Sequence, residues 1–117
     1  MIVEIYDKRV FIYKAGEVPE PLKVQIEREE TRKPLNLSGA TAIFSLFTVN
    51  AAGTRATVID SREATVDAGN GIVTHTWQAG DLVNEDKYFG VFFITLSDSS
   101  VISIPKRRYF EFEVEAL

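Results

Sequence analysis

The sequence predicts an all-β protein, an antiparallel β-sandwich of about seven to nine strands that occupies residues 1–117 as one domain. Three observations support this prediction. Apolar side chains alternate with polar ones at a two-residue period, which is the period of a strand with one buried face. Short segments rich in glycine, asparagine, aspartate and serine separate the apolar runs, as turns do. No segment has the apolar stripe of a capped helix, although residues 78–86 could hold one short helical turn.

Two segments show the clearest alternation. Leu22, Val24 and Ile26 alternate with polar residues, and near the C-terminus Phe110 and Phe112 alternate with glutamates. Both segments are predicted to be strands with one face in the core, which makes Phe110 and Phe112 expected core anchors. Residues 71–77 are rich in β-branched and aromatic residues and are also predicted to form a strand. Weaker strands are expected at residues 2–6, 10–13, 56–59, 64–66 and 101–104.

Two strands are apolar on both faces, Ala42–Phe47 and Tyr88–Leu96. A strand of this kind is either covered on both sides by its own chain or has an outer face that meets a partner. A two-sheet core covers one face only, so the second face of Tyr88–Leu96 must be covered by another molecule or exposed as a patch. This second face carries the candidate interface residues, which are Phe89, Val91 and Phe93.

The opposite face of the same strand is assigned to the core. Phe92 and Ile94 are expected to pack there together with Trp77, the only tryptophan of the chain. Trp77 and Tyr88 also support an alternative interpretation. Exposed aromatic rings stack on sugars, so the chain could instead be a carbohydrate-binding module or adhesin domain that recognises host-surface glycans.

Composition and charge exclude several classes of function. The chain has no cysteine, so disulfides and thiolate metal sites are excluded. Its net charge of −4 makes nucleic acid an unsuitable partner, and the basic run Lys106–Arg108 is interpreted as a solvated turn. No apolar stretch approaches the ~20 residues that span a bilayer, so we expect no membrane partner.

No pattern of residues points to catalysis. His75 is the only histidine, and no Gly-x-Ser-x-Gly segment is present, so we expect no catalytic residues, no enzymatic activity and no cofactor. Asp81, Glu85 and Asp86 share one loop whose oxygens could in principle hold calcium. Their spacing does not match an EF-hand, so we interpret the loop as solvated and predict no metal site, although calcium binding stays open.

Several segments together resemble a known family. They are Pro21–Ile26, Lys33–Thr41 with its Leu37-Ser38-Gly39-Ala40-Thr41 step, Gly71–Trp77 and Tyr88–Phe93. In this order they resemble the small immunoglobulin-like domains of tailed bacteriophages, especially the N-terminal domain of baseplate upper proteins. Two positions differ from the family pattern: His75 stands where tyrosine is usual, and Asn84–Lys87 replaces a glycine before Tyr88.

The resemblance implies an immunoglobulin-like sandwich and a structural role in a phage baseplate, tail or neck. It implies a homo-oligomer that also binds other phage structural proteins, present in the host cytoplasm before assembly and afterwards in the virion. The two-faced strand Tyr88–Leu96 supplies the apolar surface that such repeated contacts require.

Overall fold

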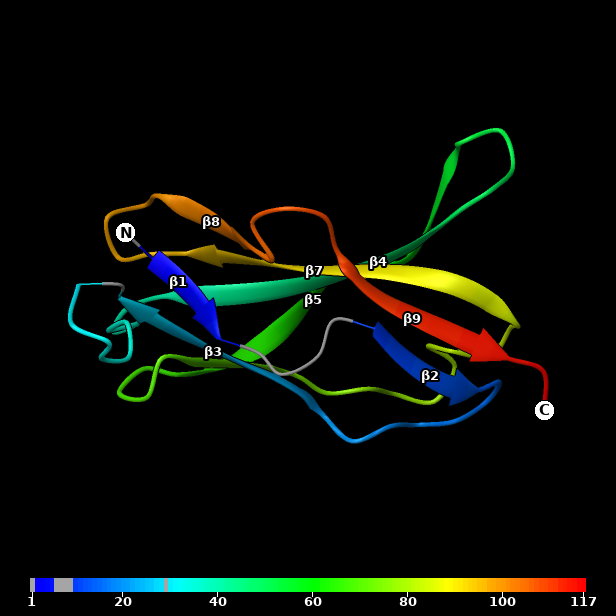
Figure 1. Ribbon diagram of the computed structural model, residues 1–117, viewed down its shortest axis with the longest axis horizontal. Coiled ribbons are helices and arrows are strands. Elements are labelled where there is room, and N and C mark those ends of the chain that lie inside the picture. Colours follow the sequence, from blue (N-terminus) through cyan, green and yellow to red (C-terminus); the bar gives the residue numbers. More distant parts are fainter. Residues whose placement is uncertain (1, 6–9, 29) are drawn as a thin grey trace.

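The computed structural model describes residues 2–5, 10–28 and 30–117 and is all-β (Figure 1). The described residues contain nine strands: β1 (Ile2–Ile5), β2 (Val10–Lys14), β3 (Leu22–Arg28), β4 (Thr41–Val49), β5 (Arg55–Asp67), β6 (Ile72–His75), β7 (Asp86–Thr95), β8 (Val101–Ile104) and β9 (Phe110–Glu115). Tyr6, which the sequence adds to the first strand, lies outside the described residues. In the described part of the chain, no helix is long and apolar enough to cross a membrane.

The strands form an immunoglobulin-like β-sandwich, as predicted. One sheet has the order β1-β3-β6-β5. The other has the order β5-β4-β7-β9-β2, with β8 beside β9 on the C-terminal half of β7. β5 belongs to both sheets, because its first part pairs with β4 and its last residues pair with β6. The molecule is elongated, with principal extents of 43 × 28 × 22 Å.

β5 differs from the sequence prediction of two separate strands. It is continuous over 13 residues, because the polar segment between Ile59 and Ala64 pairs with β4 through a register shift instead of forming a turn, and a second shift lies between Thr57 and Ile59. Bulges bend a strand and increase its twist, which lets β5 leave one sheet and enter the other. The hairpin that joins β4 to β5 extends beyond the rest of the sandwich, at the upper right of Figure 1.

β2 corrects the expectation of a purely antiparallel sandwich. It runs parallel to β9, with Phe11 beside Phe112 and Tyr13 beside Val114. The chain passes from β1 in one sheet to β2 in the other. The strand that pairs with β2 is β9, which lies near the opposite end of the sequence. The local sequence therefore holds no signal for this pairing.

Two other predicted elements are present, one of them with a different end, and a third is not found. The predicted turn at residues 98–100 is present, because the Leu96 N–H donates to the Ser100 carbonyl at 2.8 Å between β7 and β8. The strand predicted at 71–77 is shorter and ends at His75. Residues 78–86 form turns and bends up to the start of β7, and no helical turn is found there.

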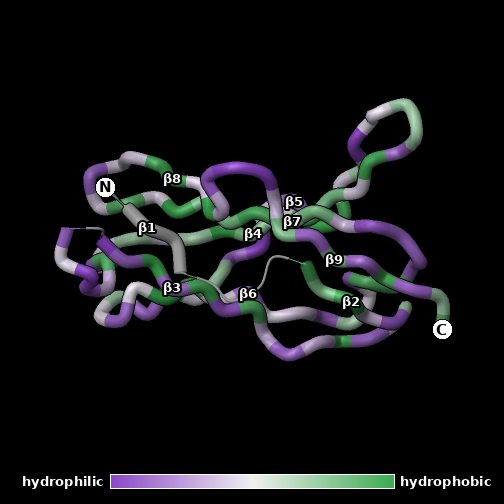
Figure 2. Tube along the Cα trace, in the orientation of Figure 1, coloured by the Kyte–Doolittle hydropathy of each residue, from purple (hydrophilic) through white to green (hydrophobic). Residues whose placement is uncertain are grey.

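The core lies between the two sheets and is rich in aromatic rings. The five expected core anchors, Trp77, Phe92, Ile94, Phe110 and Phe112, are all buried. Phe44 lies near the centre, with its ring centroid 4.9 Å from Phe92 and 5.9 Å from Trp77. Figure 2 shows that the connection between β8 and β9 is strongly hydrophilic.

Candidate functional site

The outer face of β4 and β7, opposite the core, is the candidate functional surface. Cross-strand partners in an antiparallel pair lie on the same face. Phe89 is opposite Phe47, Val91 opposite Ser45, and Phe93 opposite Ile43. The three predicted interface residues therefore share this outer face, as their spacing in the sequence requires.

Their exposure in the single chain differs. Phe93 is 38% exposed and Phe89 is half-buried, so both remain available to a partner. Val91 is only 5% exposed, so the expectation that a partner must cover it is wrong. It lies between Phe89 and Phe93 on the same face of β7 and opposite Ser45 of β4.

Three rings form an outer aromatic cluster next to Val91. It consists of Phe47 on β4, Phe89 on β7 and Tyr109, which directly precedes β9. The Phe47 and Phe89 rings stack with centroids 5.7 Å apart, and Tyr109 meets Phe47 edge-on at 5.0 Å. Aromatic pairs with these geometries attract each other beyond the area they bury. The cluster thus covers part of the apolar outer face from within the chain.

Arg55 at the start of β5 covers the same cluster. Its guanidinium carbon lies 4.3 Å from the centroid of the Phe47 ring, and its Nη2 donates a hydrogen bond of 2.8 Å to the Tyr109 hydroxyl. Sequence reasoning missed Arg55 and Tyr109. Both lie outside the strands that it examined for two apolar faces, and only the register brings them to this surface.

The other end of the same face is more open and carries three apolar side chains beside Thr95 and Ser103. We call Ile43, Phe93 and Val101 the outer patch. Ile43 and Phe93 are cross-strand partners, and Val101, opposite Thr95 on β8, lies one position further along the same face. Val101 is 60% exposed. The outer patch is therefore the part of the candidate interface that a single chain leaves uncovered.

The two rings assigned to sugar stacking are not on the surface. Trp77 is 4% exposed and Tyr88 is 2% exposed. Trp77 packs edge-on against Phe112 at 5.1 Å, and the Tyr88 hydroxyl donates to the Asn84 carbonyl at 2.9 Å. Neither ring offers a face to a sugar, which corrects this assignment.

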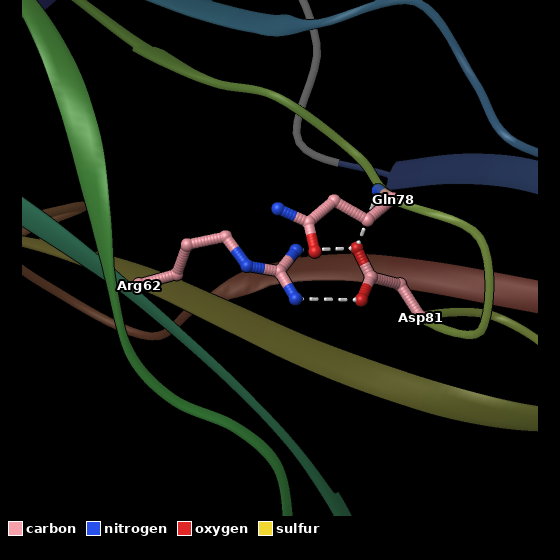
Figure 3. A network of polar contacts seen from close by, with 3 residues as sticks. All are labelled: Arg62, Gln78 and Asp81. Atoms are coloured by element: carbon pink, nitrogen blue, oxygen red, sulfur yellow. Dashed lines mark hydrogen bonds and ion pairs between the residues drawn. The ribbon is translucent and has the colours of Figure 1, made fainter.

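Asp81 is also placed differently from the prediction of a solvated acidic loop. It is buried, and both carboxylate oxygens accept hydrogen bonds from Arg62 of β5, at 2.6 and 2.9 Å. One of these oxygens also accepts from the Gln78 N–H at 2.8 Å (Figure 3). Glu85 and Asp86 are exposed. Asp81 is therefore part of an ion pair that ties the β6–β7 loop to β5. The described residues contain no group of three or more side chains that could hold a metal ion.

The environment of Asp81 keeps it ionised. Burial acts to raise the pKa of its carboxyl, but the hydrogen bonds from Arg62 and Gln78 outweigh this effect and hold the pKa below its ordinary value. Bidentate pairs between a guanidinium and a carboxylate are among the strongest polar contacts in proteins. The pair is therefore a structural contact.

His75 is fully buried and packs between rings. Its centroid lies 4.0 Å from Phe44, nearly parallel, and 4.5 Å from Trp77, edge-on. Neither ring nitrogen has a hydrogen-bond partner. Burial, with a smaller effect from the charge of Arg62, lowers the pKa of His75 to about 4. A neutral imidazole without access to solvent or to an orienting carboxylate has the surroundings of a packing residue.

A groove of about 430 Å³ lies where β5 separates from β4. It is lined by Ala40–Ala42 and by residues 63–66, among which Glu63 is the ionisable side chain. One carboxylate among small residues does not supply the acid and base pair that hydrolytic chemistry needs. The outer face of β4 and β7 therefore remains the better candidate.

Comparisons with known proteins support the architecture alone. No protein-family model and no curated protein matches the sequence. The chain is similar to the crystal structure of CopC from Methylosinus trichosporium OB3b, with a TM-score of 0.50 and 14% identity over 93% of this chain and 86% of that one. Murine CRIg also matches, with a TM-score of 0.43 and 9% identity over 100% of this chain and 98% of that one. At such identities a likeness describes the fold and leaves function open.

Proposed function

We propose that this chain is a non-enzymatic structural domain of a tailed-bacteriophage virion, placed in the baseplate, tail or neck. It works by assembling with copies of itself and with other phage structural proteins. The resemblance of its sequence segments to phage immunoglobulin-like domains supports the phage setting. The observation that carries the mode of action is the outer patch of Ile43, Phe93 and Val101.

The outer patch has the composition expected at the centre of a protein–protein interface. Phe93 and Val101 are large apolar side chains that solvent reaches in the single chain, and the outer aromatic cluster continues the apolar surface along β7. Charged groups border the outer aromatic cluster, where Lys87 pairs with Glu111 at 3.4 Å and Arg55 covers Phe47. An apolar centre with aromatic residues and a polar rim is typical of protein–protein contacts.

Burial of this surface by a partner is favourable. Apolar area removed from water contributes roughly 25 cal/mol per Å², so covering a ring and two aliphatic side chains contributes a few kcal/mol to association. The rival function, glycan recognition, loses the two rings on which it depended, because Trp77 and Tyr88 are buried. Protein assembly is therefore the function that we propose.

The substitution Phe93→Asp tests this proposal. A carboxylate in the centre of an apolar contact must be desolvated without a partner, which is costly. Because Phe93 is on the outer face, the variant is expected to keep its fold and to lose association through the outer patch, so that its mass falls below that of the parent chain at the same concentration. Light scattering coupled to size-exclusion chromatography measures the mass, and thermal unfolding of the dilute chain measures the fold.

Val83→Asp is the matched control. Val83 is an exposed valine in the loop that precedes β7, at the opposite end of this strand from Phe93, and its substitution introduces the same charge. It is expected to leave the mass unchanged. Equal masses for the parent and both variants would refute assembly through the outer patch. Unfolding of Phe93→Asp at all concentrations would show that Phe93 is a core residue.

A further inference from the structure

β2 forms an open edge of its sheet. β9 is its neighbour on one side, and the described residues place no strand on the other. Phe11 and Tyr13 face inward and stack on Phe112, with centroids 5.3 and 6.4 Å away. The alternate residues Val10 and Ile12 therefore face outward, and β2 is held to the sandwich by one face only.

The backbone of β2 shows which groups point to the open side. Just after the strand, the Ala15 N–H donates to the Glu115 carbonyl of β9 at 2.9 Å. The neighbouring Lys14 points the other way: its N–H donates to a Glu17 carboxylate oxygen, and its carbonyl accepts from the Glu17 N–H. Backbone groups of alternate residues point to the same side of a strand. The N–H and carbonyl of Ile12 therefore point away from β9.

The open side is apolar where its backbone is free. Val10 is 42% exposed and Ile12 is 60% exposed, and β2 is hydrophobic at its start in Figure 2. Natural edges are usually protected by a proline, a bulge or an inward charge, and an unprotected edge attracts another strand. Here the contact between Lys14 and Glu17 closes one end, and the middle of the strand has none of these devices.

We propose that β2 pairs antiparallel with β2 of a second copy, so that two sandwiches share one continuous sheet. The axis of the pair passes beside Ile12. Each Ile12 N–H donates to the Ile12 carbonyl of the other copy, and the two isoleucine side chains cover each other. This contact differs from the outer patch and does not depend on the phage assignment.

Charge favours a second copy as the occupant. Val10, Ile12 and Lys14 lie beside Glu111, Glu113 and Glu115 of β9 on the outward face. In the antiparallel pair, Lys14 of one copy comes opposite Val10 of the other. Its Nζ lies 3.3 Å from Glu115 of its own chain, and in the pair this charge also lies toward the Glu111 end of the other copy's carboxylate row. The strand is thus complementary to itself in its apolar centre, its charges and its length of five residues.

Ile12→Pro in a Phe93→Asp background tests this proposal, because the background removes association through the outer patch. Proline lacks the N–H that the pairing needs, and it is tolerated in an edge strand where that N–H faces solvent. The bonds between β2 and β9 use the other residues and stay intact. Sedimentation velocity is expected to show a dimer for the Phe93→Asp chain and at least a tenfold weaker dimer when Ile12→Pro is added. Ile12→Val, which keeps the N–H and the branched side chain, is the control and is expected to dimerise like its background.

Amide exchange at Ile12 gives a second measurement that needs no proline. In the Phe93→Asp chain, protection of this amide is expected to increase with protein concentration. A monomeric Phe93→Asp chain at high concentration, with an Ile12 amide that exchanges freely, would overturn the pairing and leave the outer-patch proposal intact. Protection that is independent of concentration would also overturn it. A dimer in the Phe93→Asp chain that dissociates with Ile12→Pro supports the β2 pairing. The outer patch is contradicted only if the parent chain associates no further than Phe93→Asp.

Discussion

His75 and Asp81 are the two polar side chains that the fold buries among the described residues, and they differ in how they are satisfied. Asp81 has three hydrogen bonds from Arg62 and Gln78. His75 has none and is stabilised only by its contacts with Phe44 and Trp77. An unpaired buried imidazole is tolerated when neutral, and its protonation is unfavourable.

We therefore predict that acid destabilises the fold through His75. Its pKa is about 4 in the folded chain against 6.5 when exposed, so the unfolded chain binds the proton first as pH falls. The stability contributed by the neutral ring is complete above pH 6.5 and is lost progressively as pH falls toward 4. The loss between about pH 7 and about pH 4 is on the order of 3 kcal/mol. Urea unfolding across this range measures it.

His75→Phe separates this effect from other acid sensitivity. Phenylalanine has a similar flat ring and does not titrate, so the variant is expected to lose most of the pH dependence between 6.5 and 4. Destabilisation at still lower pH is expected to persist, because the pKa of Asp81 is lowered and its ion pair is lost only when that carboxylate is protonated. An unchanged fall in stability for His75→Phe across the same range would refute the assignment to His75.

Individual residues were predictable where strand periodicity alone decides their environment. Phe92, Ile94, Phe110 and Phe112 are buried because they occupy alternate positions of regular strands. The pairing of Asp81 was not predictable, because Arg62 lies 19 residues earlier on a different strand. The burial of Val91 was not predictable either, because a two-residue period gives the face of a side chain and not how far its neighbours cover it.

The strands were predictable as segments, and their pairing was not. The turn between β7 and β8 was predicted correctly because its signal is local: the Ser100 N–H donates to a carboxylate oxygen of Asp98 at 2.9 Å. The continuity of β5 and the parallel pairing of β2 with β9 depend on distant partners. A two-residue period specifies faces, whereas register and sheet order come from tertiary contacts.

Gly71 illustrates how a connection is fixed by such contacts. It has a φ of +64°, and its carbonyl accepts from the Ile26 N–H of β3 at 2.8 Å. A Cβ at this position would lie 2.7 Å from the Ile26 carbonyl oxygen and 2.9 Å from that of Leu35. These are backbone atoms within a hydrogen-bonded junction, so they cannot move aside cheaply.

We predict that Gly71→Ala destabilises the chain much more than Gly53→Ala. Gly53 also has a positive φ, of +81°, but a Cβ there meets no atom within 4 Å. Gly53→Ala is expected to cost about 1–2 kcal/mol, which is the penalty of the left-handed backbone. Gly71→Ala is expected to cost roughly 1–3 kcal/mol more, because it also creates a steric overlap. Similar unfolding free energies for the two variants would show that the junction at Gly71 can relax.

For the molecule as a whole, the sequence predicts the architecture better than the function. A sandwich or barrel follows from alternating strands and polar turns, the resemblance to phage domains implies the immunoglobulin-like form, and the structure is an immunoglobulin-like sandwich. Function has no comparable signal here, because the chain shows no catalytic motif and a sandwich serves many functions. The proposals therefore depend on surfaces, namely the outer patch and the open side of β2.

These surfaces have different consequences for assembly. Pairing through β2 has a two-fold axis and closes after two copies. A contact through the outer patch allows further copies or a different phage protein to bind at the same time, because the patch lies at the β8 end of the outer face and β2 lies beyond β9. Two independent contacts on one small domain suit a repeated structure.

Sedimentation equilibrium of the unmodified chain over a wide concentration range tests whether the molecule works by association. One chain has a mass of 13.1 kDa. The mass is expected to increase with concentration to a multiple of this value and to fall when Phe93→Asp and Ile12→Pro are combined. A mass that stays at 13.1 kDa at every concentration would contradict self-assembly through either surface.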